Sequence, residues 1–187
     1  DARIIAGGQT LMPMLAMRLA RPAVLVDIMV TGDLRRAENS KGQLRIEAAV
    51  RQAELLADTE LPAIAPLLAM ALPWVGHVQT RSRGTICGSV AHADPSAEIP
   101  LILVALGGSI ELRSLKRRRS MPASEFFLGM MTTARADDEI VEAVSVPLRE
   151  SGFGYAFAEF GRRHGDFALC ACAAISKSTG TRFAVGG

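Results

Sequence analysis

Apolar and polar positions along this chain form short strand-like and helix-like segments that do not alternate regularly. Residues 23–28, AVLVDI, and residues 44–48, LRIEA, have the spacing of strands, and the first is apolar enough to predict a buried strand. Residues 61–71, LPAIAPLLAMA, carry an apolar face at helical spacing, with a proline in the first turn. Residues 31–43 read as a loop. Because strands and helices are mixed without a repeating β-α order, the sequence predicts an α+β fold.

The composition changes between residues 147 and 154, where we place a domain boundary. We expect residues 1–148 to form one domain of two small α/β subdomains, of about 1–50 and 51–148. Residues 149–187 would be the start of an α+β C-terminal domain and would leave it incomplete. The first residues, DARIIAGG, and the last, TRFAVGG, read as strand-turn interiors. We therefore expect the chain to be part of a longer protein.

The amino-acid composition excludes several classes of protein but does not indicate a function. The 187 residues are 49% apolar and 21% charged, which is typical of a globular protein. A net charge of +2 and an aromatic content of 5% do not favour a nucleic-acid partner, and no apolar run is long enough for a membrane span. The cysteines, Cys87, Cys170 and Cys172, lack the spacing of a disulfide framework or a zinc site. They indicate a reducing, cytoplasmic location, and Cys170 and Cys172 are expected on the core face of a strand.

Two glycine-containing turns are the candidates for chemistry: AGGQT at residues 6–10 and TICGS at residues 85–89. Glycine lets the backbone approach a ligand closely, and successive N–H groups with a nearby hydroxyl can bind an anion. Two such turns could hold the two phosphates of a dinucleotide. Neither turn has the spacing of a Rossmann fingerprint or a P-loop, so two ordinary turns remain an alternative at this point.

Together with three further segments, these turns resemble one known family. The segments are HADPSAEIP at 92–100, DDEIVEAVSVP at 137–147 and RRHGDFAL at 162–169. In this order they resemble the flavoprotein (medium) subunit of molybdenum hydroxylases, such as the carbon monoxide dehydrogenase medium subunit and the flavin domain of xanthine dehydrogenase. The resemblance extends over nearly the whole chain.

The resemblance implies that this chain binds FAD. It places cofactor contacts on the first turn with the strand before it, on the second turn with its pyrophosphate-binding N–H groups, and on four further positions. The implied contacts are Ile4, Ile5, Ala6, Gly7, Gly8, Gln9, Thr10, Val75, Thr85, Ile86, Cys87, Gly88, Ser89, Glu98, Val141 and Glu159. The chain departs from the family at two places. Cys87 stands where relatives have a glycine, and Ala158 with Glu159 stands where many have a lysine.

The resemblance also implies a role in electron transfer, with no catalytic side chain and no metal ligand in this chain. Electrons would arrive from a small subunit with [2Fe–2S] clusters, which receives them from a large subunit with a molybdopterin cofactor. Reduced FAD would pass them to an external acceptor, in a dimer of heterotrimers. A stand-alone flavin-dependent oxidoreductase and a flavin-free scaffold subunit are the alternatives. The substrate of the complex does not follow from this chain.

Individual residues near these segments have structural interpretations too. Asp94 is expected to be a turn or cap residue before Pro95, rather than half of an acid/base pair with Glu98. Trp74 is assigned to the core rather than to a stack on the flavin.

Overall fold

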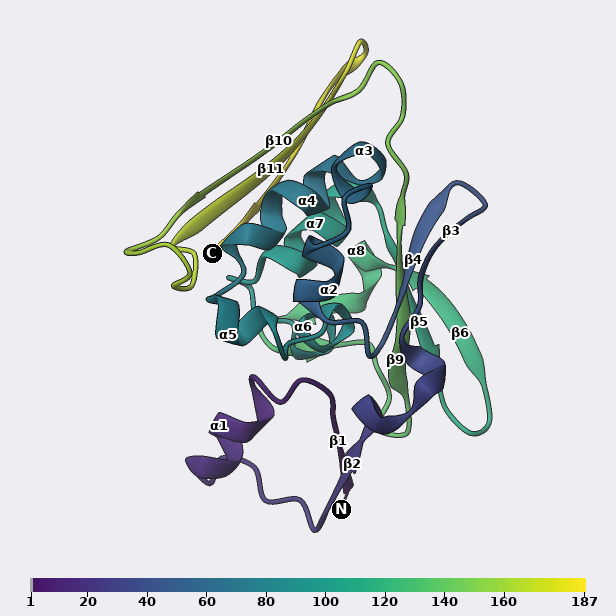
Figure 1. The fold of residues 1–187 in the computed structure, drawn as a ribbon, viewed down its shortest axis with the longest axis vertical. Coiled ribbons are helices and arrows are strands. Elements are labelled where there is room, and N and C mark those ends of the chain that lie inside the picture. Colours follow the sequence, from purple (N-terminus) through teal and green to yellow (C-terminus); the bar gives the residue numbers. More distant parts are fainter. Residues whose placement is uncertain (1) are drawn as a thin grey trace.

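The computed structural model describes residues 2–187, which form two large antiparallel sheets with helices between them, a short two-stranded hairpin and a small N-terminal lobe (Figure 1). The strands are β1 Ala2–Ile5, β2 Val24–Asp27, β3 Ala37–Ser40, β4 Gln43–Glu47, β5 Ser109–Arg113, β6 Arg118–Pro122, β7 Phe127–Gly129, β8 Thr132–Thr133, β9 Ile140–Pro147, β10 Gly154–Phe160, β11 Cys170–Lys177 and β12 Gly180–Gly186. The α-helices are α1 Leu11–Ala16, α2 Gln52–Leu56, α3 Leu61–Ile64, α4 Pro66–Ala71, α5 Val78–Arg81, α6 Ile86–His92, α7 Glu98–Leu106 and α8 Ala123–Phe126. Three 3₁₀ turns, Ile28–Val30, Gly32–Leu34 and Leu72–Trp74, join them. None of the helices within residues 2–187 is long and apolar enough to cross a membrane.

The N-terminal lobe is a small β-α-β unit in which β1 and β2 pair in parallel and α1 connects them. It lies apart from the helical layer in the view of Figure 1. The strand predicted at residues 23–28 exists as β2, but the prediction that it is buried was wrong. Val24 is 54% exposed and Val26 48%. The sheet has only two strands, and α1 has no buried residue with which to cover it.

The central sheet has five strands in the order β3-β4-β9-β5-β6, and one face of it carries the main core. Helices α6, α7 and α8 pack on that face, and apolar side chains such as Ile46, Ile110 and Val144 fill the interface. The loop expected at residues 31–43 instead contains β3. The missed signal is Lys41-Gly42, a two-residue turn with both φ angles positive, which is the geometry of a tight hairpin.

The second sheet, β10-β11-β12, covers the other side of the helices (Figure 1). Its inner face carries Ala171, Ala173 and Ile175, which are buried against the helical layer. Cys170 and Cys172 share one face of β11, as expected, but it is the outer face. The prediction that they pack in the core was therefore wrong, because the small alanines of the alternate positions bring the strand close to the helices.

Candidate cofactor-binding site

The structure brings the first glycine turn against the backbone that directly precedes the second turn, although the two segments are far apart in the sequence. A Cβ atom placed on Gly7 would lie 2.0 Å from the carbonyl oxygen of Arg83 and 2.7 Å from the Cα of Gly84. Any side chain at Gly7 would therefore collide with backbone that cannot move aside cheaply. Gly7 thus holds the N-terminal lobe against the segment that leads into TICGS.

The first turn takes a shape that depends on a second glycine. Gly8 has φ +72°, the left-handed region that favours glycine. Gln9 folds back over the turn, with its Nε2 donating to the carbonyl of Gly7 at 3.1 Å. Thr10 then precedes α1 without a side-chain capping bond. The turn exposes a short stretch of backbone beside the second turn.

The second turn is the start of helix α6. Thr85 caps the helix, with its Oγ1 accepting from the N–H of Gly88 at 3.0 Å. The N–H of Ile86 donates to the carbonyl of Val50 at 3.2 Å, and that of Ser89 to the carbonyl of Thr85 at 3.2 Å. Among residues 85–89 in the described chain, the N–H groups of Thr85 and Cys87 have no such partner. The protein itself therefore occupies most of the donors that we expected to face a phosphate.

Cys87 has an ordinary helical conformation, because it lies inside α6 and its φ is not positive. Its side chain is 3% exposed, and its Sγ donates to the carbonyl of Ile46 in β4 at 3.5 Å. Burial raises the pKa of the Cys87 thiol well above its usual range, so the thiol stays neutral. The departure from glycine thus changes the core beneath the turn and leaves the shape of the turn unaltered.

Two predicted contacts are carboxyl groups, of which Glu98 is buried and Glu159 is half-buried. Glu98 begins α7 and is 6% exposed, and Glu159 on β10 has one carboxylate oxygen buried without a hydrogen-bond partner. Burial, with a further contribution from the charge of Glu159, raises the pKa of Glu98 to about 7. Asp94 is a turn residue, as expected: its Oδ1 accepts from the N–H of Ser96 at 2.9 Å.

The loop at residues 73–76 contains one predicted contact, Val75, and is fixed by a residue that the sequence did not point to, Arg81. The guanidinium of Arg81 donates to three carbonyls, those of Pro73, Val75 and Gly76, at 3.3, 2.9 and 2.7 Å. It thereby fixes the backbone around Val75. Trp74 is only half-buried, so its assignment to the core was wrong: its ring stacks on His164 with the centroids 4.8 Å apart. This contact joins the RRHGDFAL segment to the Val75 loop.

The sequence prediction missed several residues that shape the site. Arg83 and Gly84 form the surface on which Gly7 rests, and Arg81 fixes the loop of Val75. Gly84, directly before TICGS, was the available signal. Val141 is 6% exposed and belongs to the core cluster on the face of β9 that packs against α6. Like Ile86, Thr85 and Cys87, it is a predicted contact that lies inside the protein.

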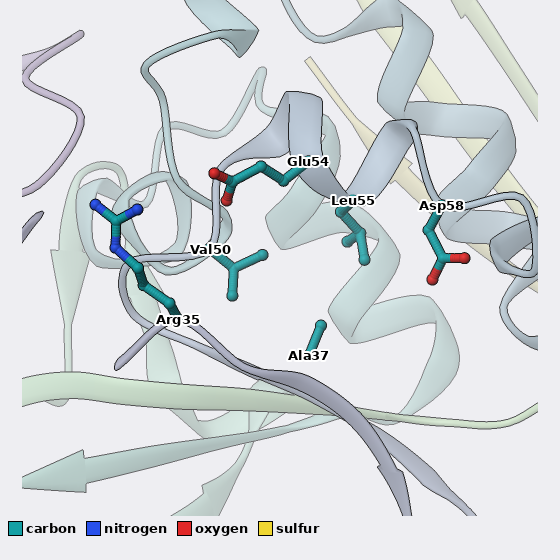
Figure 2. Close-up of a pocket in the computed structure, with 6 residues that line it drawn as sticks. All are labelled: Arg35, Ala37, Val50, Glu54, Leu55 and Asp58. Atoms are coloured by element: carbon teal, nitrogen blue, oxygen red, sulfur yellow. The ribbon is translucent and has the colours of Figure 1, made fainter. Parts of the chain in front are cut away.

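Two surface depressions lie away from the glycine turns. One of about 310 Å³ is lined by Arg35, Ala37, Val50, Glu54, Leu55 and Asp58, which Figure 2 shows around the start of α2. Another of about 380 Å³ lies on the outer face of the five-stranded sheet among arginines and glutamates. Neither is lined by a residue of the two glycine turns. The case for a cofactor site therefore rests on the turns and the buried carboxylates.

The residues present are suited to FAD. The missing side chain at Gly7 lets the first turn lie directly against the backbone of Arg83 and Gly84, which leads into the second turn. The hydroxyl of Ser89 and the N–H of Cys87 are donors of the kind that a pyrophosphate needs. Glu98 and the unpartnered oxygen of Glu159 are acceptors of the kind that sugar hydroxyls need. The arrangement thus offers both halves of a dinucleotide a matching surface.

Comparisons with known proteins also point to an FAD-binding domain. The family model described as the FAD binding domain in molybdopterin dehydrogenase matches residues 1–149. The nicotine 6-hydroxylase medium subunit of Paenarthrobacter nicotinovorans is 40% identical over 192 residues, which cover 100% of this chain and 67% of that protein. A second protein of the same organism, the 6-hydroxypseudooxynicotine dehydrogenase complex subunit alpha, is 41% identical over 94% of this chain and 59% of its own length. The chain thus spans about 59% to 67% of the length of these relatives.

Solved structures give the same result for the fold. Carbon monoxide dehydrogenase from Hydrogenophaga pseudoflava, in a form that lacks the Mo-pyranopterin moiety, matches with a TM-score of 0.94 and 33% identity over 100% of this chain and 67% of that chain. Quinoline 2-oxidoreductase from Pseudomonas putida 86 matches with a TM-score of 0.94 and 37% identity over 100% of this chain and 66% of that chain. The α+β prediction and the resemblance to medium subunits are therefore confirmed. This chain belongs to the family of FAD-binding domains found in the medium subunits of molybdenum hydroxylases.

Proposed function

We propose that this chain holds FAD between its two glycine turns and serves as the electron-transfer subunit of a molybdenum-containing hydroxylase or dehydrogenase. The observation that carries the proposal is the contact of Gly7 with Arg83 and Gly84, in a chain of an FAD-binding family. It creates one backbone surface from two turns about 75 residues apart in the sequence. When bound, FAD supplies the redox chemistry, and the protein supplies its position and its electrostatic surroundings.

Each predicted residue then has a part in binding. Ile4 to Thr10 would line one side of the cofactor, and Gly7 and Gly8 would allow its close approach. On the other side, the Cys87 N–H and the Ser89 hydroxyl would hold the pyrophosphate, while Thr85, Ile86 and Gly88 keep the turn in shape through their own hydrogen bonds. Glu98 and Glu159 would accept bonds from hydroxyl groups. Val75 and Val141 would supply apolar contact, and Arg81 holds Val75 in place.

The partners belong to the proposal as well. The relatives carry names such as medium subunit, complex subunit alpha and medium chain, which indicate assemblies of several chains. We expect a small subunit with [2Fe–2S] clusters to deliver electrons and a large subunit with a molybdopterin cofactor to act on the substrate. A dimer of such heterotrimers in the cytoplasm is the assembly that we expect.

The visible spectrum of the complete complex tests the proposal. We expect flavin and iron–sulfur absorbance together, with iron and molybdenum in the preparation, and bleaching of the flavin when the substrate of the complex is added. Bleaching by NAD(P)H in the absence of other subunits would instead favour a stand-alone oxidoreductase. A full-length chain that shows no flavin absorbance and takes up no added FAD would be a scaffold subunit and would overturn the proposal.

A further inference from the structure

The loop between β10 and β11 lies directly against the loop that contains Val75. Two successive residues of the β10–β11 loop make the contact. The ring of His164 stacks on the ring of Trp74, with the centroids 4.8 Å apart and the two planes at 29°. A Cβ atom on Gly165 would lie 2.8 Å from the carbonyl oxygen of Gly76. The β10–β11 loop therefore contacts the residue before Val75 and the residue after it.

The residues of this contact are suited to hold the two loops together. Gly165 has φ +89°, the left-handed region that favours glycine, and its missing side chain allows the close approach to Gly76. Trp74 also faces β10 itself, with its ring centroid 6.5 Å from that of Phe157. His164 is otherwise exposed, so the stack on Trp74 is what its ring contributes to the structure. The second sheet thus reaches the Val75 loop at several points.

The Val75 loop is held by two sets of contacts that come from different parts of the chain. The first is Arg81 of α5, whose guanidinium donates to the carbonyls of Pro73, Val75 and Gly76. The second is the β10–β11 loop. Residues 1–149, which match the FAD-binding family model, include Arg81 but not the β10–β11 loop. A loop that carries a predicted cofactor contact is therefore held in part from outside the matched domain.

We propose that His164 is a positioning residue that acts through Trp74 and holds the backbone at Val75 in the arrangement that binds FAD. This inference rests on the proposed function, because Val75 is a cofactor contact only there. A loop that is already ordered loses less conformational entropy when a ligand binds, and affinity rises accordingly. The second sheet would then contribute to the affinity of a cofactor site that lies in residues 1–149.

The test measures FAD binding by the full-length protein from which FAD has been removed, at one pH, by flavin fluorescence. In His164→Ala the stack is lost, and the dissociation constant should rise about three- to tenfold, the range that an aromatic pair is worth. In His164→Phe a flat ring remains, and affinity should stay within about twofold of the parent. Ser178→Ala, in the exposed turn at the other end of β11, is the control and should bind like the parent.

A double variant tests whether His164 acts through Trp74. Because Trp74→Ala and His164→Ala remove the same contact, the double variant should bind FAD within about twofold of Trp74→Ala alone. Independent roles would make the two losses multiply.

Hydrogen exchange in the absence of FAD gives a second measurement. The amides of residues 74–78 should exchange faster in His164→Ala than in the parent, while those of β11 stay protected. Faster exchange confined to this loop separates a positioning role from a general loss of stability.

The outcomes are distinguishable. The inference is overturned, and the proposed function left intact, if His164→Ala binds FAD like the parent or if His164→Phe binds as weakly as His164→Ala. Multiplied losses in the double variant, or unchanged exchange at residues 74–78, overturn it as well. A parent protein that binds no FAD overturns the proposed function, and the inference with it.

Discussion

The start of β9 and the start of α7 both bury carboxylates, but they do so in opposite ways. At β9, Glu139 is 1% exposed and accepts from Nε and Nη2 of Arg119 at 2.8 Å each and from the N–H of Ala136 at 2.9 Å. The bonds from Arg119 hold the pKa of Glu139 at about 2. At α7, Glu98 is buried with its only nearby cation committed elsewhere, and its pKa rises to about 7. A buried carboxylate supplied with donors by its own protein is structural, and one left without them is available to a ligand.

The outer face of the five-stranded sheet shows how arginine side chains supply hydrogen-bond donors to the glutamates of neighbouring strands. Arg45 of β4 lies across β9, with its Nε 2.9 Å from Glu111 Oε1 on β5 and its Nη1 2.9 Å from Glu47 Oε1. It can do so because the β9 residues between the two strands are the small Ser145 and Ala143. Strand register therefore builds this ladder of charges, which belongs to the stability of the fold.

The sharpest way to break the comparison is Glu139→Ala. It leaves Arg119 without its buried partner, and breaking a buried ion pair costs about 3 to 5 kcal/mol of unfolding free energy. Urea unfolding at neutral pH measures the loss, with Glu38→Ala, an exposed glutamate on β3, as the control. The affinity for FAD should stay unchanged in the folded protein. A cost below about 1 kcal/mol would show that the pair of Glu139 and Arg119 contributes no more than a surface ion pair.

The pH dependence of that cost has a definite sign. Because the pKa of Glu139 is lowered in the folded state, from 4.5 to about 2, its contribution is complete above 4.5 and is lost as the pH falls through 2. The difference between parent and Glu139→Ala should therefore shrink in acid.

Glu98→Gln should have the opposite effect on stability. The pKa of Glu98 is raised in the folded state, from 4.5 to about 7, so the parent loses stability as the pH rises through this range. Glutamine cannot ionise, and the variant should exceed the parent by about 2 to 3 kcal/mol above pH 7 and match it near pH 4.5. Thermal or urea unfolding at several pH values measures this, with Glu125→Gln, an exposed glutamate on α8, as the control. A parent whose stability does not fall across this range would contradict the assignment of Glu98 as an unpaired buried acid.

Gly7→Ala tests the backbone contact on the binding side of the comparison. The new Cβ would lie 2.0 Å from the Arg83 carbonyl oxygen, so the N-terminal lobe must shift away from the second turn. We expect FAD affinity to fall by at least about tenfold, which corresponds to about 1.4 kcal/mol. Gly32→Ala is the matched control, because nothing lies within 4 Å of its Cβ position and its φ is not positive. Equal affinity for Gly7→Ala and the parent would show that the contact between the turns is not needed for binding.

The sequence allowed the local elements and the family to be predicted, because hydrophobic spacing and short motifs are local properties. It could not show that Gly7 meets Arg83, because that contact depends on how two distant segments pack. The prediction of which face of β11 is buried was wrong for a similar reason. Alternation showed that Cys170 and Cys172 share a face, but only the tertiary structure decides which face is inside. Likewise, the raised pKa of Glu98 follows from its burial, and sequence spacing carries no information about that.

Cys87→Gly is the mildest test, because this residue belongs both to the second glycine turn and to the core. Its backbone lies in the turn, and its side chain lies in the core against Ile46. Glycine inside a helix costs about 1 kcal/mol, and the lost packing adds a similar amount, so urea unfolding should show a modest loss of stability. FAD affinity should stay within about threefold of the parent, because the substitution removes nothing that faces the turn. Cys87→Ala, which keeps the Cβ, should lose less stability and bind equally well. A change in FAD affinity without a change in stability would place the thiol at the cofactor and not in the core.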